Sequence, residues 1–205
     1  TLSSQIHFEQ FHSLEGDDAS CLNLNQVSRP RIFGVHPETF DKRGAFTFIA
    51  FTDNNAKKQP WLQLKKCMGK DIIPAFADLS VIQYGLKKSL GDTLFYLNER
   101  GEKIKIVLVG GLENSVFQGN LLIDDLQFLL HFPSAGGTRV MLIDAPLSEE
   151  ENIAEIMKRS FADYGIELTK ASVRLAKFNT VENTYLSVFM ILGGLGLIIG
   201  TLGLA

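Results

Sequence analysis

Two histidines near the start of the chain are the first residues whose type and spacing could do chemistry. His7 and His12 lie shortly before the neighbouring carboxylates Asp17 and Asp18. Imidazole nitrogens and carboxylate oxygens both bind metal ions, so these side chains could form a metal site if the chain turned back on itself. Polar strand and turn positions explain the same residues more simply. We favour that interpretation and assign no metal ligand.

Adjacent carboxylates occur twice and could share acid–base work. Asp17-Asp18 follows a glycine, and Asp124-Asp125 follows a short apolar run. General acid–base catalysis uses carboxylates of this kind. However, aspartates also stabilise turns and cap helices. We interpret the first pair as a turn and the second as a helix start, and assign no catalytic residue.

The sequence contains none of the short motifs that would indicate an enzyme. The phosphate-binding pattern G-x-x-x-x-G-K-[ST] is absent, and Gly110-Gly111 lacks the G-x-G-x-x-G spacing. H-E-x-x-H, C-x-x-C and G-x-S-x-G are also absent. We predict a protein that is not an enzyme and needs no cofactor.

Composition and charge exclude one class of partner. The 205 residues carry a net charge of −3 and are 45% hydrophobic, with 15 Phe. A nucleic-acid-binding domain usually shows a basic patch, whereas the cations here are scattered among acids. We predict a domain with a real core that does not bind nucleic acid.

The two cysteines leave the redox compartment open. Cys21 and Cys67 could be buried thiols, or could pair in an oxidising compartment. We favour the unpaired state. The chain begins at Thr1 without an n-region or cleavage site, so we expect an anchor or export signal upstream.

The segment 185–205 is uncharged and predicts a transmembrane helix. A bilayer core requires about 20 apolar residues. Gly196 and Gly200 form a G-x-x-x-G pair and, with Gly193, predict close packing against another membrane helix. Glycine is also simply frequent in membrane helices, and a buried core helix or a fusion-type peptide is the alternative for the whole run.

A helix is expected to lead into this run. Phe178, Val181 and Tyr185 recur near helical spacing, with Glu182 between them. A continuous helix over 171–184 would act as a rigid stalk, and we assign these four residues to it.

The rest of the chain alternates strand and helix patterns, which predicts an α+β fold. The best helix begins after Pro146 and has an apolar stripe that includes Ile153, Met157 and Phe161. A second helix is expected after Asp124, and Leu79 to Lys88 also has a helical pattern. Strands are expected over 6–14, 45–52, 121–123, 139–144 and 166–169, with a hairpin over 93–98 and 104–110. Pro, Ser and Gly residues over 133–137 indicate a boundary.

Several stretches resemble the extracytoplasmic region of FtsX/MacB-type ABC transporter permeases. The matching stretches are GDDASCLNLN at 16–25, RPR at 29–31, FG at 33–34, IPA at 73–75, IQY at 82–84, LGDTL at 90–94, FQGNLLI at 117–123, RV at 139–140, VENTYL at 181–186, GGLG at 193–196 and GTLGLA at 200–205. Each stretch is short, but their order covers most of the chain.

The resemblance implies a MacB-like periplasmic core domain between the first two membrane helices of a permease. It implies a membrane-proximal, porter-like α+β part and a distal, mainly β part. We expect the first part to comprise 1–24 and 134–170 and the second 25–133, followed by the stalk over 171–184 and the membrane helix over 185–205.

The function implied is non-catalytic coupling at the bacterial inner membrane. In such a permease, a cytoplasmic ATP-binding cassette subunit hydrolyses ATP, and this domain changes conformation on the outer side. The partners implied are that ATPase, the lipid bilayer, a second permease subunit in a homodimer or heterodimer, and a periplasmic protein. A membrane-tethered ligand-binding or sensor domain is the alternative, and a membrane-attached enzyme is the least favoured.

Overall fold

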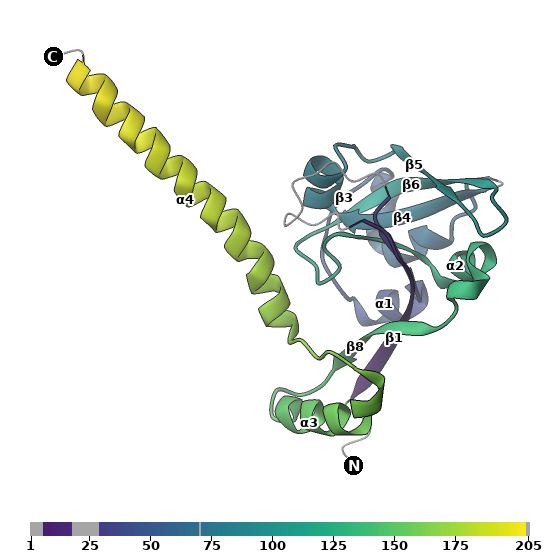
Figure 1. The fold of residues 1–205 in the computed structure, drawn as a ribbon. Coiled ribbons are helices and arrows are strands. Elements are labelled where there is room, and N and C mark those ends of the chain that lie inside the picture. The colour runs from purple at the N-terminus through teal and green to yellow at the C-terminus, as the bar shows by residue number, and fades with distance from the viewer. Residues whose placement is uncertain (1–5, 18–28, 70, 204–205) are drawn as a thin grey trace. The chain divides into compact units, whose positions relative to one another are not determined.

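The computed structural model describes residues 6–17, 29–69 and 71–203 (Figure 1). It divides into two compact units, residues 1–169 and residues 170–205. The first unit contains the sheet and the three shorter α-helices, and the second contains one long helix.

The first unit is built on an eight-stranded mixed sheet. Its strands are β1 His7–Leu14, β2 Arg31–Val35, β3 Phe48–Phe51, β4 Ile72–Asp78, β5 Thr93–Leu97, β6 Lys103–Leu112, β7 Asn120–Asp124 and β8 Thr138–Asp144. The order is β3-β6-β4-β7-β2-β1-β8, and β5 pairs with β6 outside this path. Two pairs are parallel, β2 with β7 and β4 with β6.

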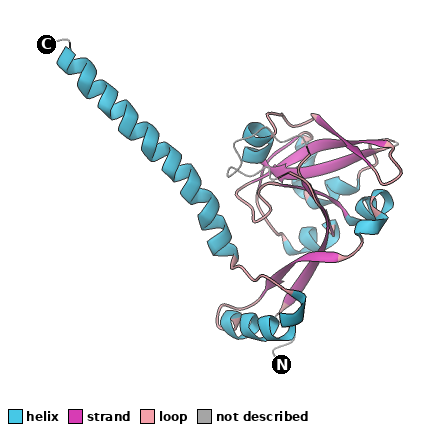
Figure 2. Cartoon of the chain, viewed as in Figure 1, coloured by secondary structure: helices cyan, strands magenta, loops and turns pink. Residues whose placement is uncertain are grey.

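In the first unit, helical segments connect the strands and lie beside the sheet (Figure 2), and the second unit contributes α4. The α-helices are α1 Pro37–Arg43, α2 Asp125–His131, α3 Glu150–Ser160 and α4 Ala171–Gly203. Shorter helical turns are η2 Asn54–Lys58, η3 Trp61–Lys65, η4 Val81–Gly85, η5 Pro133–Ala135 and η6 Ala162–Tyr164. The turn η4 has π geometry within the region predicted to be helical.

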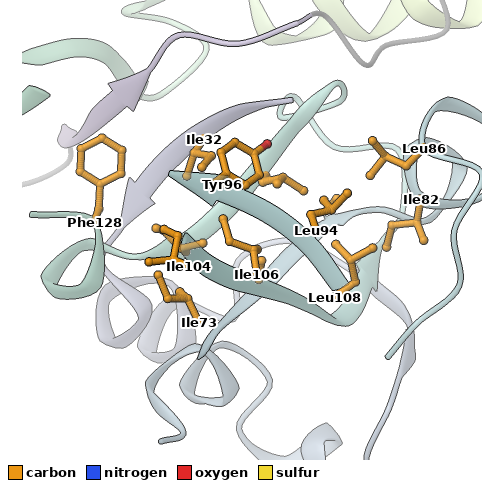
Figure 3. Packing of buried hydrophobic residues seen from close by; sticks show 14 of the residues in the cluster. Ile32, Ile73, Ile82, Leu86, Leu94, Tyr96, Ile104, Ile106, Leu108 and Phe128 are labelled. Carbon is orange, nitrogen blue, oxygen red and sulfur yellow. The ribbon is translucent and has the colours of Figure 1, made fainter. Parts of the chain in front are cut away.

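Successive side chains of a strand point to opposite faces of the sheet. The central strands are buried on both faces because one core cluster covers each face. On β2, Ile32 belongs to one core cluster and Phe33 to the other. On β7, Leu121 and Ile123 flank Leu122 in the same alternating way. Figure 3 shows the aliphatic cluster, in which Ile104, Ile106 and Leu108 of β6 take part.

The second cluster, on the other face, is rich in aromatic rings. Phe40 of α1 packs on Trp61 of η3, with ring centroids 4.6 Å apart. Phe11 of β1 contacts Phe40 and Phe117, with centroids 6.0 and 5.5 Å away. The indole nitrogen of Trp61 donates to the carbonyl of Ala45 at 2.8 Å, so this buried polar group is satisfied. The cluster ties α1 and η3 to the sheet.

Strand β1 joins β8, the last strand of the first unit, to the rest of the sheet. β1 pairs with β2 on one side and with β8 on the other. Strand β8 therefore lies beside the start of the chain, and α3 lies near the same end of the sheet (Figure 1). The sheet continues through both parts of the predicted two-part division, and that division stays a prediction.

The structure of this unit differs from two sequence-based expectations. The strand predicted over 166–169 is wrong, because that segment has no strand partner and follows a left-handed turn at Gly165. Helix α3 has the expected apolar stripe, but it ends at Ser160 and none of its residues is fully buried.

The second unit is a single continuous helix, α4, as the sequence predicts. The predicted membrane span, in contrast, is not supported. Within the described part of the chain, no helix combines the length and the apolar character needed to cross a bilayer.

Candidate functional site

Two parallel strands end side by side and bring two helix starts together. Val35, the last residue of β2, is in register with Asp124, the last residue of β7. The residues that follow are His36, at the N-cap position of α1, and Asp125, the first residue of α2. Polar groups that follow parallel strands gather at one sheet edge, where α/β proteins often place functional residues.

Strand β1 completes the cluster from the neighbouring position in the sheet. His12 of β1 is in register with Gly34 of β2. A Cβ atom at position 34 would lie 2.6 Å from Oδ1 of Asp125 and 2.9 Å from Cβ of Phe128. Glycine at this position therefore lets α2 approach the sheet closely enough for Asp125 to reach His12.

The carboxylate of Asp125 lies between the imidazoles of His12 and His36. The carboxylate of Glu9 contacts the other ring nitrogen of His36. Nδ1 of His12 is 2.5 Å from Oδ1 of Asp125, and Nε2 of His36 is 3.6 Å from Oδ2. Nδ1 of His36 is 3.0 Å from Oε1 of Glu9. We call these four residues, Glu9, His12, His36 and Asp125, the histidine–carboxylate cluster.

The cluster is shielded from water on one side. The Asp125 side chain is 8% exposed, and the His12 side chain is 19% exposed. The His12 ring stacks on Phe128 with centroids 5.9 Å apart. The His36 side chain is 48% exposed, so protons can reach the cluster from solvent.

Further charges surround the cluster. Asp124, next to Asp125, has a pKa raised mainly by burial, with smaller contributions from Glu38 and Asp125. Glu38 of α1 pairs with Lys65 of η3, and this hydrogen bond lowers the pKa of Glu38 and raises that of Lys65. The cluster therefore lies in a region with more carboxylates than permanent cations.

The arrangement can exchange protons and can join chain segments. Imidazole is the side chain that changes charge between about pH 5 and 8. Among the described residues, no group of three or more His, Cys, Asp or Glu side chains is suited to hold a metal ion. The chemistry that this geometry offers is reversible ion pairing between β1 and the starts of α1 and α2.

A second buried ionisable group lies at the end of β4. Asp78 is 1% exposed and accepts hydrogen bonds from the backbone N–H of Ser115 at 3.1 Å and from its hydroxyl at 3.2 Å. Burial raises the pKa of Asp78 to about 6, and the two hydrogen bonds from Ser115 oppose this shift.

The structure separates the residues that the sequence singled out first. His7 is exposed, Asp17 forms an isolated bridge with Pro30, and Asp18 lies outside the described residues. Asp124 does occupy the N-cap position of α2 but makes no side-chain capping hydrogen bond. Its neighbour Asp125 enters the cluster, which the sequence did not predict.

The remaining predicted site residues lie in α4 or carry thiols. A Cβ atom at Gly193, Gly196 or Gly200 would meet nothing within 4 Å in the structure, so the packing role of these glycines stays a prediction. The guanidinium of Arg174 lies 5.4 Å from the ring centroid of Phe178. The side chains of the other three predicted stalk residues, Val181, Glu182 and Tyr185, lie outside the described ones, and the stalk role stays a prediction.

The expectation that Cys21 and Cys67 are unpaired stays a prediction, as does the less favoured alternative that they pair. Cys67 is exposed, and Cys21 lies outside the described residues.

Comparisons with known proteins give similarity to solved structures and none at the level of sequence families. No protein-family model matches the sequence, and no curated protein matches it. Among solved structures, the chain is similar to the periplasmic region of MacB from Actinobacillus actinomycetemcomitans. The identity is 13%, the TM-score is 0.39, and the match covers 78% of this chain and 69% of the other. At this TM-score the similarity assigns neither a fold nor a function to the chain.

Proposed function

We propose that the chain is the non-catalytic extracytoplasmic domain of an FtsX/MacB-type ABC transporter permease in a bacterial inner membrane. In this proposal a cytoplasmic ATP-binding cassette subunit hydrolyses ATP, and the domain changes conformation outside the membrane in response. The substrate class is left open, because the family resemblance extends to transporters with different tasks.

The pairing of the first and last strands of the first unit carries the proposal. His7, at the start of β1, is opposite Asp144, at the end of β8. A domain inserted between two consecutive segments of a larger protein needs its entry and exit close together. The β1–β8 ladder brings the first and last strands together, which favours such an arrangement, and the ordered short motifs of the sequence support the same assignment.

The helix that follows supports a mechanical role. A rigid helix rises about 1.5 Å per residue and can transmit a displacement over its length. We propose that residues 171–184 act as a stalk, and that residues 1–24 with 134–170 form the membrane-proximal part and 25–133 the distal part. Gly193, Gly196 and Gly200 would then pack α4 against another helix of the permease.

Accessibility of the β5–β6 hairpin tests the compartment. Arg100 lies at the exposed turn between these strands. We expect Arg100→Cys, in a full-length protein with Cys21→Ser and Cys67→Ser, to react with a membrane-impermeant maleimide in intact spheroplasts. The protein without Arg100→Cys is the matched control. Labelling only after lysis would contradict the assignment.

The identity of the associated subunit separates the proposal from its alternative. Purification of the full-length protein from membranes should recover an ATP-binding cassette ATPase. Recovery of a kinase or other signalling protein in place of an ATPase would favour the membrane-tethered sensor or ligand-binding domain.

A further inference from the structure

The histidine–carboxylate cluster lies where β1 changes its neighbours. His12 pairs with Gly34 of β2 on one side and with Thr138 of β8 on the other. The register with β8 shifts between Phe11 and His12, which marks a local irregularity of the ladder. Such irregularities bend a strand and re-aim its side chains.

Beyond this point, β1 and β8 continue as a two-stranded ladder. We call residues 7–10 and 141–144 the arm, and it includes the register pairs Phe8–Ile143 and Gln10–Met141. An isolated pair of strands is marginally stable in water. Phe11 is fully buried and fixes the base of the arm, whereas Phe8 is 49% exposed.

Leu142 of β8 packs against the aromatic cluster, and polar side chains provide further connections from the arm to the rest of the first unit. Glu9 pairs with His36 at the start of α1. Asp144, at the end of β8, pairs with Arg43, the last residue of α1. Because arginine stays protonated, the second connection is constant near neutral pH. The first depends on the charge of an imidazole.

We propose that the histidine–carboxylate cluster is a proton-controlled latch, which holds the arm to α1 and α2 when His12 and His36 are protonated. The charged groups that face the two imidazoles come from several elements. They are Glu9 of β1, Glu38 of α1 and Asp125 of α2. Asp124 and Lys65 of η3 lie next to these carboxylates and do not contact the imidazoles.

The sign of the effect follows from this charge balance. With neutral imidazoles, the groups named above comprise four carboxylates and one cation, Lys65, so the carboxylates repel one another. Protonation of His12 and His36 supplies two positive charges, which pair His12 with Asp125 and His36 with Glu9 and Asp125. The latch is therefore closed below the range in which histidine titrates and open above it.

Amide hydrogen exchange of the whole chain tests the latch directly. After correction for intrinsic rates, we expect protection of residues 8–10 and 141–143 to be about tenfold higher near pH ~5.5 than near pH ~8, because a charge-assisted hydrogen bond is roughly twice as strong as a neutral one. Amides of β4 and β6 serve as the internal reference, because these strands lie in the buried core. Equal protection of the arm at both pH values would overturn the proposal.

Three variants assign the effect to the cluster. The double substitution His12→Gln and His36→Gln should remove the pH dependence of arm protection. Glu9→Gln, which is less disruptive because it keeps the shape of the side chain, should reduce it. His7→Gln is the matched control, since His7 lies on the same arm and is exposed. Loss of the pH dependence in His7→Gln, or its retention in the double variant, would contradict the latch.

The tests of the latch and of the proposed transporter function, on which the latch does not depend, can fail independently of each other. The exchange measurement uses only this chain, whereas the compartment and the ATPase partner are tested in the full-length protein. A pH-dependent arm in a protein that recovers no ATPase would leave the latch in place and remove only the transporter assignment.

Discussion

At the residue scale, Asp78 shows how burial destabilises the charged form of a carboxylate. It is buried at the end of β4, and its carboxylate receives two hydrogen bonds from Ser115. Two hydrogen bonds do not replace the hydration that is lost, because desolvation is the larger effect on its pKa, which rises to about 6. An acid whose pKa is raised on folding stabilises the protein only while it is protonated.

This reasoning predicts that Asp78→Asn stabilises the protein at neutral pH. The contribution of Asp78 is complete below its unfolded pKa of 3.8 and is lost as pH rises to about 6. That shift corresponds to a free energy on the order of 3 kcal/mol. The amide of Asn can still accept from the backbone of Ser115 and donate to its hydroxyl oxygen. Denaturant unfolding should therefore show a gain of roughly 1–3 kcal/mol near neutral pH and little change in acid.

Ser115→Ala provides the opposite control for Asp78. It removes the hydroxyl donor but leaves the backbone N–H, so the charged carboxylate loses one of its two hydrogen bonds. Its destabilising effect should be larger near neutral pH than in acid. If the Asp78→Asn variant were less stable than the unsubstituted protein near neutral pH, the hydrogen bonds from Ser115 would outweigh the desolvation of the carboxylate.

The same scale shows why the cluster was not predicted from the sequence. The pair Asp124-Asp125 was visible as a candidate, but His12 is 113 positions away from its partner Asp125. Local spacing cannot report such a contact. It becomes apparent only when β1, β2 and β7 are known to be neighbours.

At the element scale, the strands that were missed are those that lack an alternating pattern. RIFGV of β2 and IIPAFAD of β4 are buried almost throughout. A strand covered on both faces reads as a continuous apolar run, so period-two analysis does not detect it. The β5–β6 hairpin was predicted correctly because β5 alternates between buried and exposed residues.

The segment 166–169 shows the reverse error. Ile166 and Leu168 suggested a strand, but a strand requires a neighbour to pair with, and the sequence does not reveal whether one is available. Helix α4 was predicted as continuous because helical hydrogen bonds are local and need no distant partner.

The approach of α2 to β2 gives an element-scale prediction. Gly34→Ala places a methyl group 2.6 Å from Oδ1 of Asp125 and 2.9 Å from Cβ of Phe128. Helix α2 must move away, and such overpacking typically costs about 1–3 kcal/mol. Gly137→Ala is the matched control, because its added Cβ meets nothing within 4 Å. The free energy of unfolding, measured with denaturant, should fall only in the first variant.

A second measurement connects this change to the cluster. Because the displaced helix carries Asp125 away from His12, Gly34→Ala should also weaken the pH dependence of arm protection. Equal stability of the two glycine variants would mean that α2 can move away from β2 without loss of stability. The close contact between α2 and Gly34 would then not be required for folding.

At the scale of the whole molecule, the two units differ in how far their apolar side chains are buried. The first unit buries its apolar side chains in two clusters, one on each face of the sheet. The second exposes most of its large apolar side chains, among them Phe189, Ile191 and Leu195. Large exposed apolar surfaces usually mark contacts with another molecule. We therefore expect α4, and not the first unit, to determine assembly.

The glycines of α4 give the prediction at this scale. Gly196 and Gly200 are four residues apart and thus lie on one side of the helix, with open space at both positions. If another helix of the permease packs there, larger side chains push the two backbones apart. The double substitution Gly196→Leu and Gly200→Leu should abolish association of the permease subunits and ATPase stimulation, while the unfolding of residues 1–169 is unchanged. Gly194→Leu is the matched control, because it makes the same exchange in the same helix on a different side. Unchanged association in the double variant, measured by crosslinking of the full-length protein in membranes, would show that these glycines do not form a packing face.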